Sequence, residues 1–155
     1  MKKDNIKCQR LAAPYSTSSS IDDEVIVQRI KNSGVLTLNR PKSLNALNLR
    51  MIRKMMPDWE NDPHMDMVIM KGTGSKAFCA GGDILAVTEA GKVGGDLARD
   101  FFKEEYILNN KIGTYLLPYV AIIDGITMGG STDVLDNEFV LADHMEDINR
   151  LFAEN

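Results

Sequence analysis

Two short apolar segments, each followed by a glycine-rich loop, constrain the fold of this chain more than any other feature. The first covers residues 67–70 and leads towards Gly81 and Gly82, and the second covers residues 120–124 and continues into the loop 125–130. Apolar runs this short, bounded by turn residues, are typical of strands buried inside a parallel sheet. We therefore expect two strands that aim the backbone N–H groups of their loops at one point.

The preceding residues predict a β-hairpin and a helix. Residues 24–30 and 35–39 are apolar and rich in β-branched residues, and the turn residues Asn32-Ser33-Gly34 separate them. Asn45 is a plausible N-cap for a helix that runs through Trp59. Pro57 lies inside the apolar stripe of this helix and is expected to end or kink it at Met56.

The first glycine-rich loop joins its strand to a helix that starts near Asp83. Glycines here let backbone N–H groups face a ligand, and a helix N-terminus adds partial positive charge. The loop is therefore suited to an anion or a developing oxyanion, although a plain turn would also explain Gly81 and Gly82. The phosphate-binding patterns G-x-x-x-x-G-K-[ST] and G-x-G-x-x-G are absent.

Residues 94–117 predict a long helix that Pro118 stops. Glu105 follows the apolar Phe101 by four positions, which places it on or beside the apolar face, and Glu104 lies about 100° around the helix. A buried carboxylate needs a partner or a function, whereas a solvated one is the more common case.

Composition excludes several classes of protein. Lys and Arg number 18 against 22 Asp and Glu, so the net charge is −4, which argues against nucleic acid as the main partner. The two cysteines form neither a disulfide scaffold nor a four-ligand zinc site, and we expect no metal. Cys79 is expected to be a small core residue rather than a nucleophile. No apolar run reaches the roughly 20 residues of a membrane span, so we expect no membrane partner.

Residues 1–20 are basic, rich in hydroxyl side chains and poor in acids. This composition is typical of an organellar transit segment, although a disordered tail shares it. We therefore expect three regions, namely a targeting segment over 1–20, a folded unit over 24–131 and a helical segment over 132–155.

The segments Asn39-Arg40-Pro41, 44–47, 77–83 and 118–130 follow one another along the chain. In that order they resemble motifs of the crotonase (enoyl-CoA hydratase/isomerase) superfamily. The segments 101–109 and 127–130 resemble most closely its 3-hydroxyisobutyryl-CoA hydrolases, which act in valine breakdown in the mitochondrial matrix. This resemblance implies an α/β fold, an incomplete crotonase-like ββα spiral that begins with the hairpin.

The resemblance also implies roles for individual residues. The backbone N–H groups of Gly82 and Gly130 correspond to the donors that hold the thioester oxygen, and Glu105 corresponds to a carboxylate beside the acyl group and its 3-hydroxyl. Coenzyme A arrives as part of the substrate, so no separate cofactor is expected. The segment expected to hold its adenine end comprises Ala80, Asp83, Ile84 and Leu85.

After Gly130 the sequence departs from the family pattern. Residues 131–136 replace an apolar helix, and the family's catalytic Glu and Asp segments have no counterpart, while residues 136–155 resemble a later helix of the same hydrolases. The resemblance therefore implies a form with an internal deletion and little or no hydrolase activity. Alternatives are a non-catalytic CoA-binding or subunit-interaction fragment, and an enzyme of the hydratase/isomerase type. In the complete family fold, further turns of the spiral cover the sheet, and this sequence lacks them. We therefore expect one uncovered sheet edge, one uncovered apolar sheet face and self-association.

Overall fold

The computed structural model describes residues 23–92 and 94–129, which form two β-sheets and three α-helices. In the larger sheet the strand order is β1-β2-β3-β5, with β1 antiparallel to β2 and the other neighbours parallel. The two remaining strands pair in parallel as a small second sheet. The strands are β1 (Val25–Ile30), β2 (Ser33–Leu38), β3 (Met67–Gly72), β4 (Ala77–Cys79), β5 (Tyr119–Ile122) and β6 (Ile126–Thr127).

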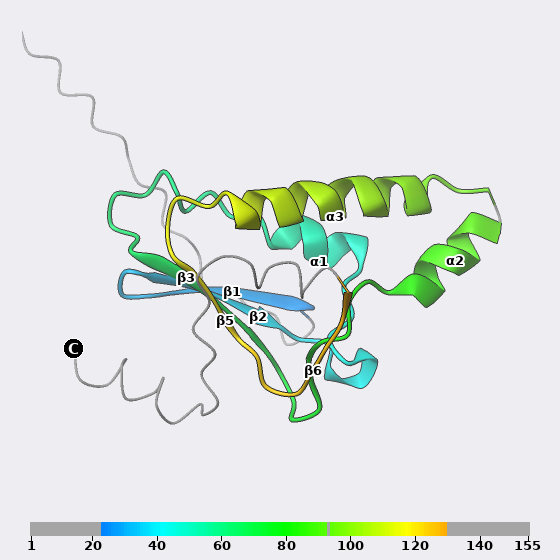
Figure 1. The fold of residues 1–155 in the computed structure, drawn as a ribbon, viewed down its shortest axis with the longest axis horizontal. Coiled ribbons are helices and arrows are strands. Elements are labelled where there is room, and N and C mark those ends of the chain that lie inside the picture. Colours follow the sequence, from blue (N-terminus) through cyan, green and yellow to red (C-terminus); the bar gives the residue numbers. More distant parts are fainter. Residues whose placement is uncertain (1–22, 93, 130–155) are drawn as a thin grey trace, which may run out of the picture.

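Helices α1 (Leu49–Lys54) and α3 (Leu97–Gly113) lie on the same side of the larger sheet, and α3 packs on α1 (Figure 1). Helix α2 (Ile84–Lys92) precedes α3 and also packs on it. A short 3-10 turn over Pro41–Ser43 connects β2 to the segment before α1. The mixed α/β class and the parallel β3–β5 pair confirm the fold class expected from the sequence.

Alternating side chains divide the core into two clusters on opposite faces of the sheet. Leu36, Val68 and Ala121 belong to the large cluster, which includes residues of α1 and α3. Val35, Ile69 and Ile122 form the second cluster, and each is 3–5% exposed.

The sheet face that the sequence predicted to be uncovered is thus buried at the residues of the second cluster. An alternating strand pattern reveals which side chains share a face, but it does not reveal what covers that face. Self-association stays a prediction, and the apolar side chains available for it lie elsewhere. The most exposed are Leu85, Tyr106, Leu116 and Met128.

The hairpin is confirmed, but its turn lies earlier than predicted. Ile30 pairs with Ser33, so Lys31 and Asn32 form the turn, and Lys31 has a φ of 54°. Gly34 belongs to β2 and faces the ring of Trp59, with no room for a Cβ between them. This glycine therefore serves packing, which a local turn pattern does not distinguish from a turn.

The predicted N-cap of the first helix is wrong, whereas its end lies close to the position expected from Pro57. Asn48 is the N-cap of α1, with its side chain accepting a hydrogen bond from the Met51 N–H at 2.9 Å. The helix ends at Lys54, two residues before Met56, and does not continue to Trp59, because a residue that precedes a proline disfavours helical geometry. Trp59 is nevertheless buried, as the apolar spacing suggested.

The predicted long helix is shorter at both ends, since α3 covers Leu97–Gly113. Strands β4 and β6 were not predicted, because three and two residues are too few for a periodic pattern. The segments 1–20 and 132–155 lie outside the described residues. None of the helices in 23–92 and 94–129 has the length and apolarity that crossing a bilayer requires.

Candidate functional site

The two glycine-rich loops come together, as the sequence predicted. Strands β4 and β6 pair in parallel, and the Met128 N–H donates to the Cys79 carbonyl at 3.0 Å. Gly81 has a φ of 85°, and a Cβ on it would lie 3.0 Å from the Met128 carbonyl oxygen. A Cβ on Gly129 would lie 3.2 Å from the Gly81 Cα. Both glycines are required for this close backbone approach. Gly130 lies outside the described residues.

Gly82 is held in place by the chain on either side of it. The Leu47 N–H donates to the Gly81 carbonyl at 2.8 Å, and the Asp83 N–H donates to the Leu47 carbonyl at 2.8 Å. Within the described part of the chain, the Gly82 N–H itself donates no hydrogen bond. The loop therefore presents one free, fixed backbone donor, which is what an oxyanion site needs.

Helix α3 places a ring and a carboxylate against this glycine. A Cβ on Gly82 would lie 2.8 Å from Phe101 Cζ and 3.7 Å from Glu105 Oε1. Phe101 is buried, and Glu105 is half-buried. Burial raises the pKa of the Glu105 carboxyl, because desolvation penalises its charged form. The structure thus brings together two of the three residues expected at the thioester, Gly82 and Glu105.

The neighbouring Glu104 points to another helix. Its two oxygens accept from Arg53 Nε at 2.7 Å and Arg53 Nη2 at 2.6 Å, which links α3 to α1. The hydrogen bonds from Arg53 hold the pKa of Glu104 below its ordinary value. The two adjacent carboxylates therefore differ, one paired with a cation and one lying against Gly82.

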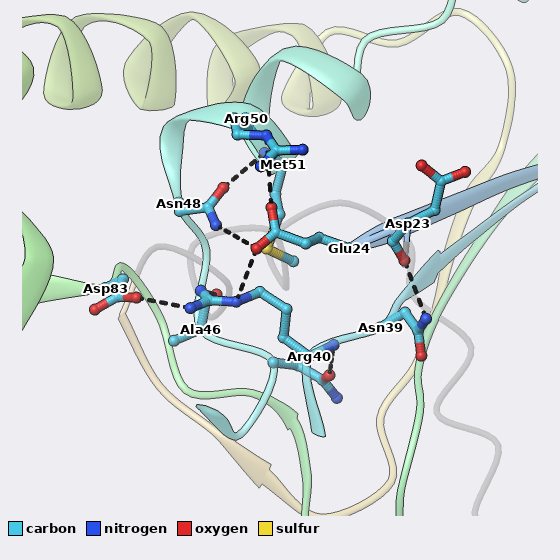
Figure 2. A network of polar contacts seen from close by, with 10 residues as sticks. Asp23, Glu24, Asn39, Arg40, Ala46, Asn48, Arg50, Met51 and Asp83 are labelled. Atoms are coloured by element: carbon cyan, nitrogen blue, oxygen red, sulfur yellow. Dashed lines mark hydrogen bonds and ion pairs between the residues drawn. The ribbon is translucent and has the colours of Figure 1, made fainter. Parts of the chain in front are cut away.

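A polar network lies behind the loop, centred on Arg40 (Figure 2). The guanidinium donates to the Ala46 carbonyl at 2.7 Å and to Asp83 Oδ2 at 3.1 Å. Its Nε lies 3.3 Å from Glu24 Oε1, and the same oxygen accepts from Asn48 Nδ2 at 3.0 Å. The network joins the start of β1, the segment before α1 and the start of α2.

An almost wholly apolar cavity of about 230 Å³ adjoins the site. It lies between α1, α2 and the start of α3, and the Phe101 ring that faces Gly82 forms part of its lining. Its lining is Asn48, Leu49, Arg50, Asp83, Ala86, Val87, Leu97 and Phe101.

The residues expected to hold coenzyme A lie directly around Gly82. The N–H groups of Ala80, Asp83 and Ile84 already donate to carbonyls of Leu44, Leu47 and Gly82. Contacts to a ligand would therefore come from the other backbone groups and from side chains. Those of Ile84 and Leu85 are 55% and 79% exposed.

Two further details concern residues that are common in active sites. Cys79 is fully buried at the base of the loop, as expected for a core residue. Among residues 23–92 and 94–129, no three His, Cys, Asp or Glu side chains gather in a way that could hold a metal ion.

Sequence reasoning missed Arg40 and Asn45 as parts of the site. Asn45 is fully buried, accepts from the Arg40 N–H and donates to the Thr73 and Ala77 carbonyls, all at 2.9 Å. A positive φ of 55° is the property that Asn tolerates best among residues with side chains. The signal available was the Asn-Arg-Pro motif followed closely by Asn45.

Comparison of the sequence with known protein families identifies one that matches this chain. A sequence model described as enoyl-CoA hydratase/isomerase matches residues 33–137, which is more than half of the chain. The chain belongs to that family. The match includes both glycine-rich loops, α3 and the Arg40 network apart from Glu24.

Curated relatives in the family carry a more specific name. The chain is 65% identical over 112 residues to the mitochondrial 3-hydroxyisobutyryl-CoA hydrolase of Xenopus tropicalis, covering 70% of this chain and 29% of that protein. Against the hydrolase of the same name from Danio rerio it is 60% identical over 119 residues, covering 75% and 31%. The chain thus spans about a third of the length of these relatives.

Solved structures agree with the fold. A carnitinyl-CoA dehydratase from Mycobacterium thermoresistibile matches with a TM-score of 0.69 and 43% identity, over 73% of this chain and 34% of the other. An enoyl-CoA hydratase from Rhodobacter sphaeroides 2.4.1 matches with a TM-score of 0.67 and 34% identity, over 70% and 34%. The described residues therefore have the fold of one part of a larger family unit.

Proposed function

We propose that this chain forms part of an acyl-CoA site of the 3-hydroxyisobutyryl-CoA hydrolase type, and that it binds the thioester without hydrolysing it. The Gly82 N–H donates to the thioester oxygen, and Glu105 faces the acyl group and its 3-hydroxyl. The observation that carries this proposal is the free Gly82 donor beside the half-buried Glu105 carboxylate.

The chemistry of a thioester explains why this pair suits it. Attack of water on the carbonyl carbon moves negative charge onto the oxygen, and a preorganised N–H is worth a few kcal/mol to that charge in a dry site. Gly130 is proposed as the second donor. The 3-hydroxyl of the acyl group is a donor, and the Glu105 carboxylate accepts from it.

Turnover requires more than these groups. The resemblance places the general acid/base and a second carboxylate in segments with no counterpart in this sequence. Loss of a general acid/base costs about 10² to 10⁴ in rate, and the losses at one site need not multiply. We therefore expect no hydrolysis above background by this 155-residue chain.

The coenzyme A moiety is proposed to lie along the segment that contains Ala80, Asp83, Ile84 and Leu85. The relatives named above are mitochondrial by name, and residues 1–20 have a transit-like composition. We propose import into the mitochondrial matrix. A cytosolic fluorescent fusion of residues 1–30 in a eukaryotic cell would contradict this.

A hydratase/isomerase activity is the second candidate. The solved structures at 34% and 43% identity are named as a hydratase and a dehydratase of acyl-CoA substrates, which favours a shared thioester site. Water addition to an enoyl-CoA gives no free thiol, so the two reactions are separable in one assay. A subunit-interaction role would appear as co-purification with a full-length homologue.

The test is a thiol-release assay with 3-hydroxyisobutyryl-CoA on the purified chain, with crotonyl-CoA hydration followed in parallel and ligand affinity measured by calorimetry. We expect measurable binding, weakened by Glu105→Ala, and no thiol release or hydration above buffer. Clear thiol release that Glu105→Ala abolishes would contradict the lack of turnover. Absence of binding by the folded chain would contradict the proposed site.

A further inference from the structure

We propose that Arg40 is a positioning residue, which fixes the Gly82 N–H by tying together the two backbone segments that hold it. This inference rests on the proposed function of Gly82 and assigns a role to a residue that is not among the site residues proposed above. The side-chain contacts of Arg40 are with Ala46, Asp83 and Glu24, and not with Gly82 or Glu105.

The argument begins with the two segments that form the Leu47–Gly82 bridge. The hydrogen bonds from Leu47 N–H to Gly81 and from Asp83 N–H to Leu47 enclose Gly82 on both sides. Ala46 immediately precedes Leu47, and Asp83 immediately follows Gly82. The Arg40 guanidinium donates to the Ala46 carbonyl and to the Asp83 carboxylate. One side chain therefore joins both segments of the bridge, one residue away on each.

The guanidinium itself is firmly held. The Arg40 N–H donates to the Asn45 side chain, and its carbonyl accepts from the Ser43 and Asn45 N–H groups at 2.9 Å each. Its Nε pairs with Glu24 at 3.3 Å, and the side chain is 20% exposed. Rigid attachment at both ends of a side chain is what a positioning role requires, because a flexible support would not fix the bridge.

Asp83 links Arg40 to helix α2, because its carboxylate accepts hydrogen bonds from both. Asp83 Oδ2 accepts from Arg40 (Figure 2). Its Oδ1 accepts from the Ala86 N–H at 3.3 Å in the first turn of the helix. The direction in which Gly82 presents its N–H is thus determined by a charged contact behind it. The contacts to Ala46 and Asp83 use two different guanidinium nitrogens, Nη1 and Nη2, so the single ammonium nitrogen of a lysine is not equivalent here.

The experiment compares the full chain with Arg40→Met, Arg40→Lys and Asp83→Asn. Arg99→Met is the matched control, since Arg99 is an exposed arginine of α3 that pairs with Asp96 and Asp100. The first readout is the stretching frequency of a ¹³C-labelled thioester carbonyl in bound 3-hydroxyisobutyryl-CoA, which reports the N–H donated to the oxygen. The second is amide hydrogen exchange at Leu47 and Asp83 in the free chain.

We expect the carbonyl frequency to fall on binding to the native chain and to Arg99→Met. In Arg40→Met most of this shift is lost and affinity falls about tenfold, because a charge-assisted contact is removed. Arg40→Lys recovers only part of the shift. Exchange at Leu47 and Asp83 becomes at least about tenfold faster in Arg40→Met than in Arg99→Met.

A native carbonyl shift in both Arg40→Met and Asp83→Asn would overturn the role of Arg40. Asp83→Asn decides the matter if Arg40→Met does not fold, because asparagine keeps the acceptor for the Ala86 N–H. If the native chain binds no thioester, the proposed function fails, and exchange still tests the positioning. Unchanged exchange at Leu47 and Asp83 in the folded variants would then overturn it.

Discussion

The carboxylate of Glu105 lies against Gly82, with 3.7 Å between Oε1 and the position that a Cβ on this glycine would occupy. Phe101, one helical turn earlier, is closer still, at 2.8 Å from the same position. One face of α3 therefore closes over the glycine and leaves no room for a side chain. Stability and ligand binding both depend on the absence of a side chain at position 82.

Substitution Gly82→Ala should destabilise the chain by about 1–3 kcal/mol, because the new methyl group forces the buried Phe101 ring to move. It should also weaken acyl-CoA binding, since the displaced ring lies on the helix that carries Glu105. Urea unfolding and calorimetry measure the two effects. Gly91→Ala in α2 is the control, with nothing within 4 Å of its Cβ, and should gain about 0.5–1 kcal/mol. Equal stability of the two variants would contradict this packing.

The stability of the chain should depend on pH through Glu105. Burial raises its pKa in the folded state, so the folded chain binds more protons than the unfolded one between the two pKa values. The free energy of unfolding therefore falls as pH rises through that window. Glu105→Gln should gain stability relative to the native chain as pH rises from about 4 to about 7.

Glu104→Gln provides the control with the opposite sign. Arg53 lowers the pKa of Glu104, so this carboxylate contributes stability above its unfolded pKa that is lost as pH falls through the folded value. The free energy of unfolding of Glu104→Gln should therefore decrease relative to that of the native chain as pH rises. Denaturant unfolding at several pH values gives both slopes, and slopes of the same sign would rule out the assigned environments.

The contact between Gly34 and Trp59 should show as a coupled pair. A methyl group at position 34 overlaps the indole ring, so Gly34→Ala should cost about 1–3 kcal/mol. Trp59→Leu removes the ring, so in that background Gly34→Ala should cost almost no stability. A double-mutant cycle by urea unfolding measures the coupling. Additive effects would mean that the ring does not face β2.

Asn45 should tolerate little change. Asn45→Ala leaves the Arg40 N–H and the Thr73 and Ala77 carbonyls without their partner and keeps a positive φ, so we expect a loss of about 2–4 kcal/mol. Asn48→Ala, which removes the cap of α1 and a part-buried hydrogen bond to Glu24, should cost about 1 kcal/mol. A thermal or urea melt of each variant measures the difference, and a larger loss at Asn48 would reverse the assignment.

The elements whose apolar residues follow a regular local pattern were predictable from the sequence. Apolar runs identified β3 and β5, and their glycine-rich continuations correctly predicted that the two loops meet. Glu105 was placed correctly because its spacing from Phe101 fixes a helical face. In each case the pattern that was used lies within one short segment of the sequence.

Contacts between distant segments were not predictable. Arg40 and Asp83 are 43 residues apart, and no local pattern reveals an ion pair across that separation. Asn45 and Asn48 are both good N-cap residues, so propensity alone chose the wrong one. Gly34 resembled a turn residue because its packing partner, Trp59, lies far along the chain.

The most direct test of the acyl-CoA site is the ¹⁵N-resolved amide spectrum of the chain during titration with 3-hydroxyisobutyryl-CoA. The Gly82 amide proton should move strongly downfield as its free N–H gains an acceptor, while the Gly91 amide in α2 stays in place. A Gly82 resonance that does not move at saturating ligand would contradict the account.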